Sequence, residues 1–185
     1  MKVGNLKDTV HRADDFVVPE EVDLDRRVGE AREHGLDRTA VDEHVATVTL
    51  NRPDKANAVN LEMFDALTEA GRDLAANRSV RAVVLAGAGD NFCAGIDVNE
   101  LAGKTTIEYR AWIEHMEQPL VTIARLNKPV IAQVQGVAAA NGMGLVAASD
   151  LAIAADNVKM GLTAINVGLN CVGPVIPVAR CVGRK

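Results

Sequence analysis

Glycine-rich turns followed by polar residues are the first candidates for chemistry in this sequence, because such turns bind phosphate groups through backbone N–H groups. Gly103-Lys104-Thr105 has the form of the end of a phosphate-binding loop, but the pattern requires a glycine five residues earlier, where Val98 stands. Gly87-Ala88-Gly89 follows an apolar run, as in a dinucleotide-binding turn, but Phe92 occupies the position of the third glycine. Neither kind of nucleotide-binding loop is predicted.

Side chains that act as nucleophiles or metal ligands are few and scattered. Ser79 and Ser149 lie in no G-x-S-x-G elbow, which argues against a serine hydrolase. The cysteines are odd in number without C-x-x-C spacing, and the histidines form no H-x-x-x-H pair. These residues are Cys93, Cys171, Cys181, His11, His34, His44 and His115. We expect reduced, buried thiols, no disulfide framework and no metal site.

The charge of the chain is concentrated at its start. The first 44 residues carry twelve acidic and seven basic side chains, whereas the remainder carries thirteen of each. The formal net charge of -5 provides no basic surface for a phosphate backbone, so no nucleic-acid partner is expected. The sequence has no secretory signal and no run of about 18 strongly apolar residues. A cytoplasmic protein without a membrane partner is therefore expected, with an acidic N-terminal extension at residues 1–35.

Strand and helix patterns alternate after this extension, as in an α/β protein. A β-branched strand is predicted at 45–50, and a helix at 61–77 begins at the N-cap Asn60. Later elements are strands at 81–86, 129–134 and 150–154, with helices at 107–126 and 142–148. Pro119 is expected to kink or split the longer of these two helices. The last element, 174–182, stops at Lys185 without a polar tail, so the core domain, residues 36–185, looks incomplete at its C-terminus.

Three segments in this order and spacing resemble the crotonase, or enoyl-CoA hydratase/isomerase, superfamily over about residues 36–185. They are Leu50-Asn-Arg-Pro-Asp-Lys-Ala-Asn-Ala58, Phe92-Cys-Ala-Gly-Ile-Asp97, and Gln135-Gly-Val-Ala-Ala-Ala-Asn-Gly-Met-Gly-Leu145 with Asp150-Leu-Ala-Ile-Ala154. The alternative is that Gly136, Gly142 and Gly144 only permit close strand–helix packing. The resemblance implies a spiral of β-β-α units, the ClpP/crotonase fold, with its C-terminal helical part missing.

The resemblance also implies an acyl-CoA thioester as substrate or ligand, and no separate cofactor. Its carbonyl oxygen would lie in an oxyanion hole formed by the backbone N–H groups of Ile96 and Asn141. Asn141 departs from the family's usual glycine, but its N–H remains. CoA contacts would come from Lys55, Ala56, Ala58, Ala94, Ile96, Asp97 and Val98. Lys55 and Lys104 are candidates for phosphate contacts, although surface lysines are common.

Both glutamates that a hydratase of this family uses are absent, because their positions hold Gly144 and Ala164. The aspartate nucleophile of related dehalogenases would fall at Val172, which excludes that reaction. The position of the dehalogenase histidine base holds Glu117, a candidate base or a solvated helix residue. Cys171 is a candidate nucleophile or an inert thiol.

Three functions are compatible with the sequence. One is an enoyl-CoA hydratase-like lyase or isomerase of fatty acid metabolism. The second is a non-catalytic acyl-CoA-binding or scaffold protein, and the third is an inactive truncated fragment. The resemblance further implies a homotrimer or a dimer of trimers in a full-length parent protein.

Overall fold

The computed structural model describes residues 36–170 and 172–182. The predicted acidic extension, residues 1–35, and Cys171 lie outside the described residues. A five-stranded sheet has the order β1-β2-β3-β4-β6, and a second sheet pairs β5 with β7. Only β1 is antiparallel to its neighbour in the larger sheet. The predicted α/β class is confirmed.

The strands are short, and most of them fall where the sequence predicts them. Their bounds are β1 Leu36–Asp42, β2 Val45–Leu50, β3 Ala82–Gly87, β4 Val130–Val134, β5 Val137–Ala139, β6 Leu151–Ala154 and β7 Lys159–Gly161. β1, β5 and β7 were not predicted. The turn between β1 and β2 uses Glu43 and His44 at positive φ, positions that Asn and Gly occupy more often, so it leaves no hairpin signal.

Four α-helices are present among the described residues. They are α1 Leu61–Ala76, α2 Thr106–Ala124, α3 Asn141–Ala148 and α4 Val172–Val182, with 3-10 turns at Pro53–Lys55, Val98–Leu101 and Ala164–Val167. As predicted, Asn60 caps α1, since its side chain accepts a hydrogen bond from Met63 N–H. Of the kink or split predicted at Pro119, the split is wrong, because α2 continues through this buried proline. A proline removes only one intrahelical bond, and the packed face of α2 holds the helix together.

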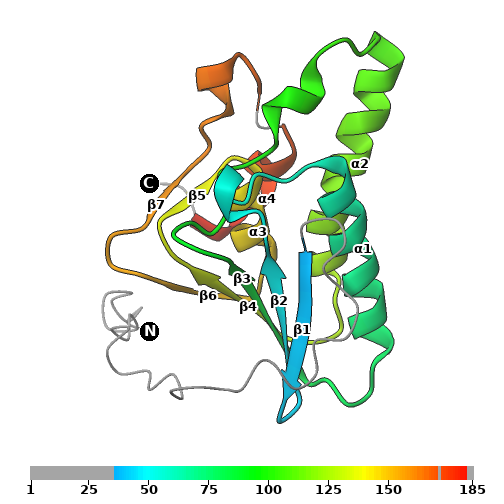
Figure 1. The fold of residues 1–185 in the computed structure, drawn as a ribbon, viewed down its shortest axis with the longest axis vertical. Helices are drawn as coiled ribbons and strands as arrows, with labels where there is room; N and C mark the ends of the chain where they lie inside the picture. The colour runs from blue at the N-terminus through cyan, green and yellow to red at the C-terminus, as the bar shows by residue number, and fades with distance from the viewer. Residues whose placement is uncertain (1–35, 171, 183–185) are drawn as a thin grey trace, which may run out of the picture.

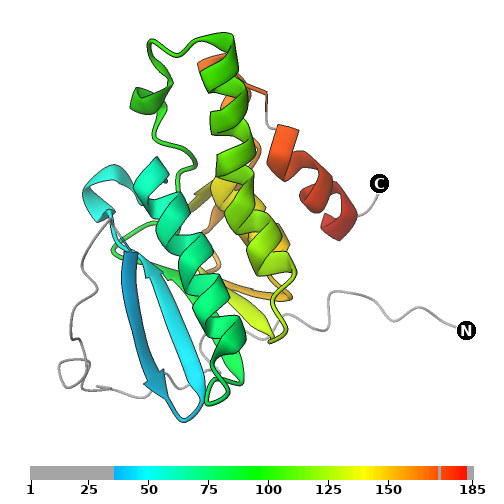
Figure 2. The same ribbon diagram turned by 90° about the vertical axis from the view of Figure 1, so that its right-hand side faces the viewer.

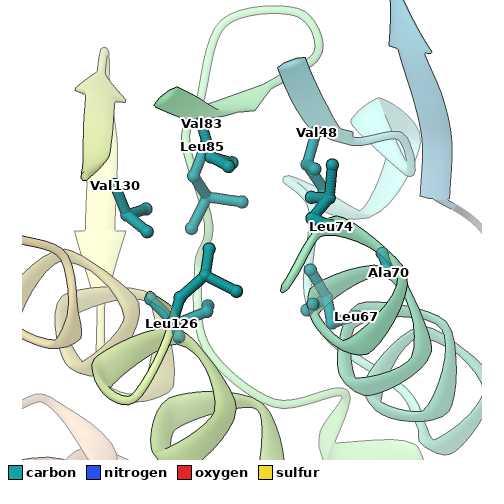
Figure 3. Close-up of a pocket in the computed structure, with 10 residues that line it drawn as sticks. Val48, Leu67, Ala70, Leu74, Val83, Leu85, Leu126 and Val130 are labelled. Atoms are coloured by element: carbon teal, nitrogen blue, oxygen red, sulfur yellow. The ribbon is translucent and has the colours of Figure 1, made fainter. Parts of the chain in front are cut away.

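α1 and α2 lie side by side on one face of the larger sheet (Figures 1 and 2). Apolar side chains of both helices meet those of β2, β3 and β4 in the core, around a cavity of about 20 Å³ (Figure 3). Its lining is Val48, Leu67, Ala70, Gly71, Leu74, Val83, Leu85, Ile123, Leu126 and Val130. A gap lined in this way offers water no polar partners, so it is a packing defect of the core.

Candidate functional site

The loop after β2 is held by a buried asparagine. Asn57 is fully buried and has a left-handed backbone with φ 55°, which asparagine tolerates better than most residues. Its Nδ2 donates to the carbonyl oxygens of Ala88 at 2.8 Å and Asn91 at 2.7 Å. Its Oδ1 accepts from the N–H of Arg52 at 2.9 Å. One side chain thus fixes this loop against the loop after β3.

An ion pair joins the same loop to the second motif. Arg52 Nη2 lies 3.0 Å from Asp97 Oδ2, and Arg52 Nη1 donates to the carbonyl oxygen of Ala58 at 2.6 Å. Burial acts to raise the pKa of Asp97, but hydrogen bonds from Arg52 and Asn99 outweigh it and hold this pKa below its usual range. The Asp97 carboxylate is therefore ionised at neutral pH and bonded within the protein.

Backbone hydrogen bonds bring together residues that the family resemblance predicts to contact CoA. Ala94 N–H donates to Ala56 at 2.9 Å, and Val59 N–H donates to Gly95 at 2.8 Å. Asp97 N–H donates back to Val59 at 2.9 Å. The first and second motifs consequently lie edge to edge.

The second motif also contacts the start of α3. Cys93 N–H donates to Val137, and Ala139 N–H donates to Cys93, both at 2.9 Å. A Cβ on Gly142 would lie 2.2 Å from the carbonyl oxygen of Cys93, so only glycine allows this approach. Gly95 has φ 111°, and a Cβ on it would lie 3.0 Å from that of Ala140. All three motifs therefore meet at one place.

Ile96 follows Gly95 in the sequence, and Asn141 follows Ala140. Their N–H groups therefore lie on two segments of backbone that approach each other at Gly95 and Ala140. Neither N–H has a hydrogen-bond acceptor among the described residues. Asn141 is also the first residue of α3, where the helix dipole favours negative charge. The arrangement offers two unpaired donors to an oxygen atom that carries partial negative charge.

Within the described part of the chain, two buried side-chain donors also have no hydrogen-bond partner. Asn141 is 5% exposed, and its Nδ2 has no hydrogen-bond partner. The other is Nε1 of Trp112, on the buried face of α2. Buried polar groups are nearly always paired, so each is a place where a further group would be favourable.

The positions of the two absent glutamates are closed. A Cβ on Gly144 would lie 2.9 Å from Cβ of Pro174 in α4 and 3.2 Å from Cδ1 of Leu120 in α2. Ala164 is buried in the 3-10 turn after β7. Neither position carries a group that transfers protons.

Glu117 lies on α2, half-buried against the first turn of α4. A Cβ on Gly173 would lie 2.8 Å from its Oε1 and 3.0 Å from its Cγ. Gly173 precedes Pro174, which contacts Gly144, and Gly144 lies one turn from Asn141. Glu117 therefore lies next to the residue of α4 that precedes the contact between Pro174 and Gly144.

Three further residues predicted to contact CoA or its phosphates are Lys55, Lys104 and Val98. Lys55 is exposed, and so is Val98. Lys104 Nζ donates to the carbonyl oxygen of Glu100, so it is already engaged. Lys55 is the freer of the two candidates for a phosphate contact.

The thiols differ from one another. Burial raises the pKa of Cys93 to about 12, so this thiol stays protonated and unreactive. Cys181 is exposed, which contradicts the prediction that the thiols are buried. It lies near the end of α4, where its Sγ is 3.4 Å from the carbonyl oxygen of Ala147.

Across the described part of the chain, no three His, Cys, Asp or Glu side chains cluster in a way that could hold a metal ion. None of the helices described is long and apolar enough to cross a membrane.

Sequence reasoning missed the residues that support the site. Arg52 and Asp97 are 45 positions apart, and their pairing depends on the fold. Asn57 lies in the first motif, residues 50–58, but nothing in the sequence indicates that its side chain is buried. The backbone of Ala140 is strained, with φ 48° and ψ -115°, and the presence of an alanine at this position does not signal that strain.

Known proteins resemble this chain in both sequence and fold. A sequence model of the enoyl-CoA hydratase/isomerase family matches residues 40–185. The crystal structure of an enoyl-CoA hydratase from Mycobacterium smegmatis is 42% identical, with a TM-score of 0.78 over 82% of this chain and 59% of that chain.

Two similar sequences are enzymes named for CoA thioesters. The 1,2-epoxyphenylacetyl-CoA isomerase of Escherichia coli is 38% identical over 70% of this chain and 51% of its own length. The (E)-benzylidenesuccinyl-CoA hydratase of Thauera aromatica is 36% identical over 70% of this chain and 52% of its own length. The chain spans about half the length of these curated relatives. It belongs to the enoyl-CoA hydratase/isomerase family, within the crotonase superfamily.

Proposed function

We propose that this protein binds an acyl-CoA thioester with the carbonyl oxygen between the N–H groups of Ile96 and Asn141. The observation that supports it most is that both donors are unpaired on backbones held in contact at Gly95 and Ala140. Fixed donors of this kind stabilise developing negative charge without reorganising. The names of the two relatives above, both acting on CoA thioesters, agree with this class of ligand.

The CoA portion would run along the paired first and second motifs. Ala56 and Ala94 join these motifs directly, with Ala58, Ile96 and Val98 close to them in sequence. Exposed Lys55 is available for a phosphate group. The Asp97 carboxylate, neutralised by Arg52, would support the loop more than it would repel the anionic ligand.

We further propose that hydration is not the main activity. General acid–base groups each contribute about 10²–10⁴-fold, and Gly144 and Ala164 supply none. Glu117 is the candidate base for an enolate-type reaction. A non-catalytic acyl-CoA-binding or scaffold role is the second candidate, favoured by Pro174 filling the space next to Gly144. Trimeric assembly, a cytoplasmic location and the absence of nucleic-acid partners stay predictions.

A matched pair of ligands tests the binding mode. Butyryl-CoA has the thioester carbonyl, whereas S-butyl-CoA lacks it and is otherwise similar. We expect butyryl-CoA to bind about tenfold more tightly by calorimetry, as two hydrogen bonds would supply. Equal affinities would contradict the two-donor site, and no binding of either ligand would contradict CoA recognition altogether.

A pair of glycine variants tests whether the two backbone N–H groups are positioned by the contact between Gly95 and Ala140. Gly95→Ala forces a side chain towards Ala140 at a positive φ, so we expect it to remove the preference for the thioester. Gly103→Ala is the control, because Gly103 also has a positive φ but would contact nothing within 4 Å. Loss of the preference in both variants would point to general destabilisation.

A further inference from the structure

The side chain of Asn141 is the strongest unexplained feature of this site. Its Nδ2 is buried without a partner among residues 36–170 and 172–182, although the family's usual glycine would leave no such group. An unpaired buried donor lowers stability unless something supplies an acceptor. The backbone N–H of the same residue is a separate donor, so this amide is free for a second contact.

The position of Asn141 in α3 indicates what that contact would be. Asn141 and Gly144 are three residues apart and share one face of the helix. Gly144 packs on Leu120 of α2 and Pro174 of α4, so this face is turned towards those helices. The proposed CoA contacts lie elsewhere, in the loops that follow β2 and β3. An acyl chain that runs from the two N–H groups towards α2 and α4 would pass the Asn141 amide, and it would need α4 to move aside at Pro174.

We propose that Asn141 Nδ2 donates a hydrogen bond to an oxygen atom on the acyl chain, which makes Asn141 a specificity-determining residue for oxygen-bearing acyl-CoA thioesters. This inference rests on the proposed function. The acceptor would be a neutral hydroxyl or keto oxygen. Glu117 lies on the same side, against the first turn of α4, and its negative charge disfavours an acyl chain that ends in a carboxylate.

The test compares affinities for butyryl-CoA, 3-hydroxybutyryl-CoA in both enantiomers, acetoacetyl-CoA and succinyl-CoA in competition with a fluorescent CoA thioester. The readout is the ratio of each affinity to that for butyryl-CoA, because a general loss of affinity cancels from it. For the unmodified protein we expect about a tenfold preference for the hydroxy or the keto compound and no preference for succinyl-CoA.

Two variants change the donor in different ways. Asn141→Gly removes the side chain, and Asn141→Asp keeps its shape but replaces the donor with an acceptor. We expect the tenfold ratio to fall to about one in both, whereas the exposed control Asn157→Asp keeps it. Thermal melting shows which variants fold, and the ratio in either folded variant decides the test.

The binding results distinguish a failure of the proposed role of Asn141 from a failure of acyl-CoA binding as a whole. Equal affinities for all four acyl groups in the unmodified protein would overturn the role of Asn141, as expected if only an ordered water occupies the donor. A preference that persists in the folded Asn141 variants would overturn it as well. Failure of every thioester to bind would overturn the proposed function itself.

Discussion

Ala140 has a backbone conformation that alanine rarely adopts. Its φ of 48° and ψ of -115° fall in a region that glycine reaches without strain. We expect Ala140→Gly to raise the free energy of unfolding by about 1 kcal/mol, since relief of strain exceeds the added chain entropy. Urea denaturation measures this change. The neighbouring Ala139→Gly should lower stability, because Ala139 has no such strain, and a loss in both variants would argue against a strained Ala140.

Cys93 makes stability depend on pH in the alkaline range. Its pKa is raised from 9.0 to about 12 in the folded protein, so only the unfolded chain releases this proton between these values. Its contribution is complete below pH 9 and is lost as the pH rises towards 12. The free energy of unfolding should fall by up to ~1.4 kcal/mol per pH unit from this group. Cys93→Ala should show a correspondingly smaller slope in denaturation series, whereas equal slopes would exclude Cys93 as the cause.

At the scale of elements, the sequence predicts helices and strands that are long enough to show a repeating apolar pattern, and it misses strands that are too short to show one. The apolar spacing and the cap at Asn60 placed α1 within one residue of its observed end. β5 and β7 have three residues each, too few to show alternation, and their pairing depends on the turn of the chain around α3. The two-donor site was predicted only through the family resemblance, because unpaired N–H groups leave no mark in residue identity.

The packing of α3 on α4 determines whether a hydratase glutamate can be restored. Gly144 has Pro174 and Leu120 within 3.2 Å of any added Cβ. We expect Gly144→Glu to destabilise the protein by about 1–3 kcal/mol and to leave crotonyl-CoA hydration at its original level. Gly161→Ala is the control, because its Cβ would contact only Thr163, at 3.7 Å. A stable Gly144→Glu variant that hydrates crotonyl-CoA would show that α4 moves aside.

At the scale of the whole molecule, β6 forms an edge of the larger sheet among the described residues, and it is apolar. Leu151 is 62% exposed and Ile153 is 40% exposed on this strand. Unpaired strand edges of this composition promote association between chains, which charged side chains oppose. We expect the mean mass from light scattering to rise with protein concentration, and Leu151→Lys to reduce that rise. Ile107→Lys is the control, since Ile107 is exposed in the first turn of α2 and is not part of a strand. A mass that stays monomeric at every concentration in the unmodified protein would contradict association through β6.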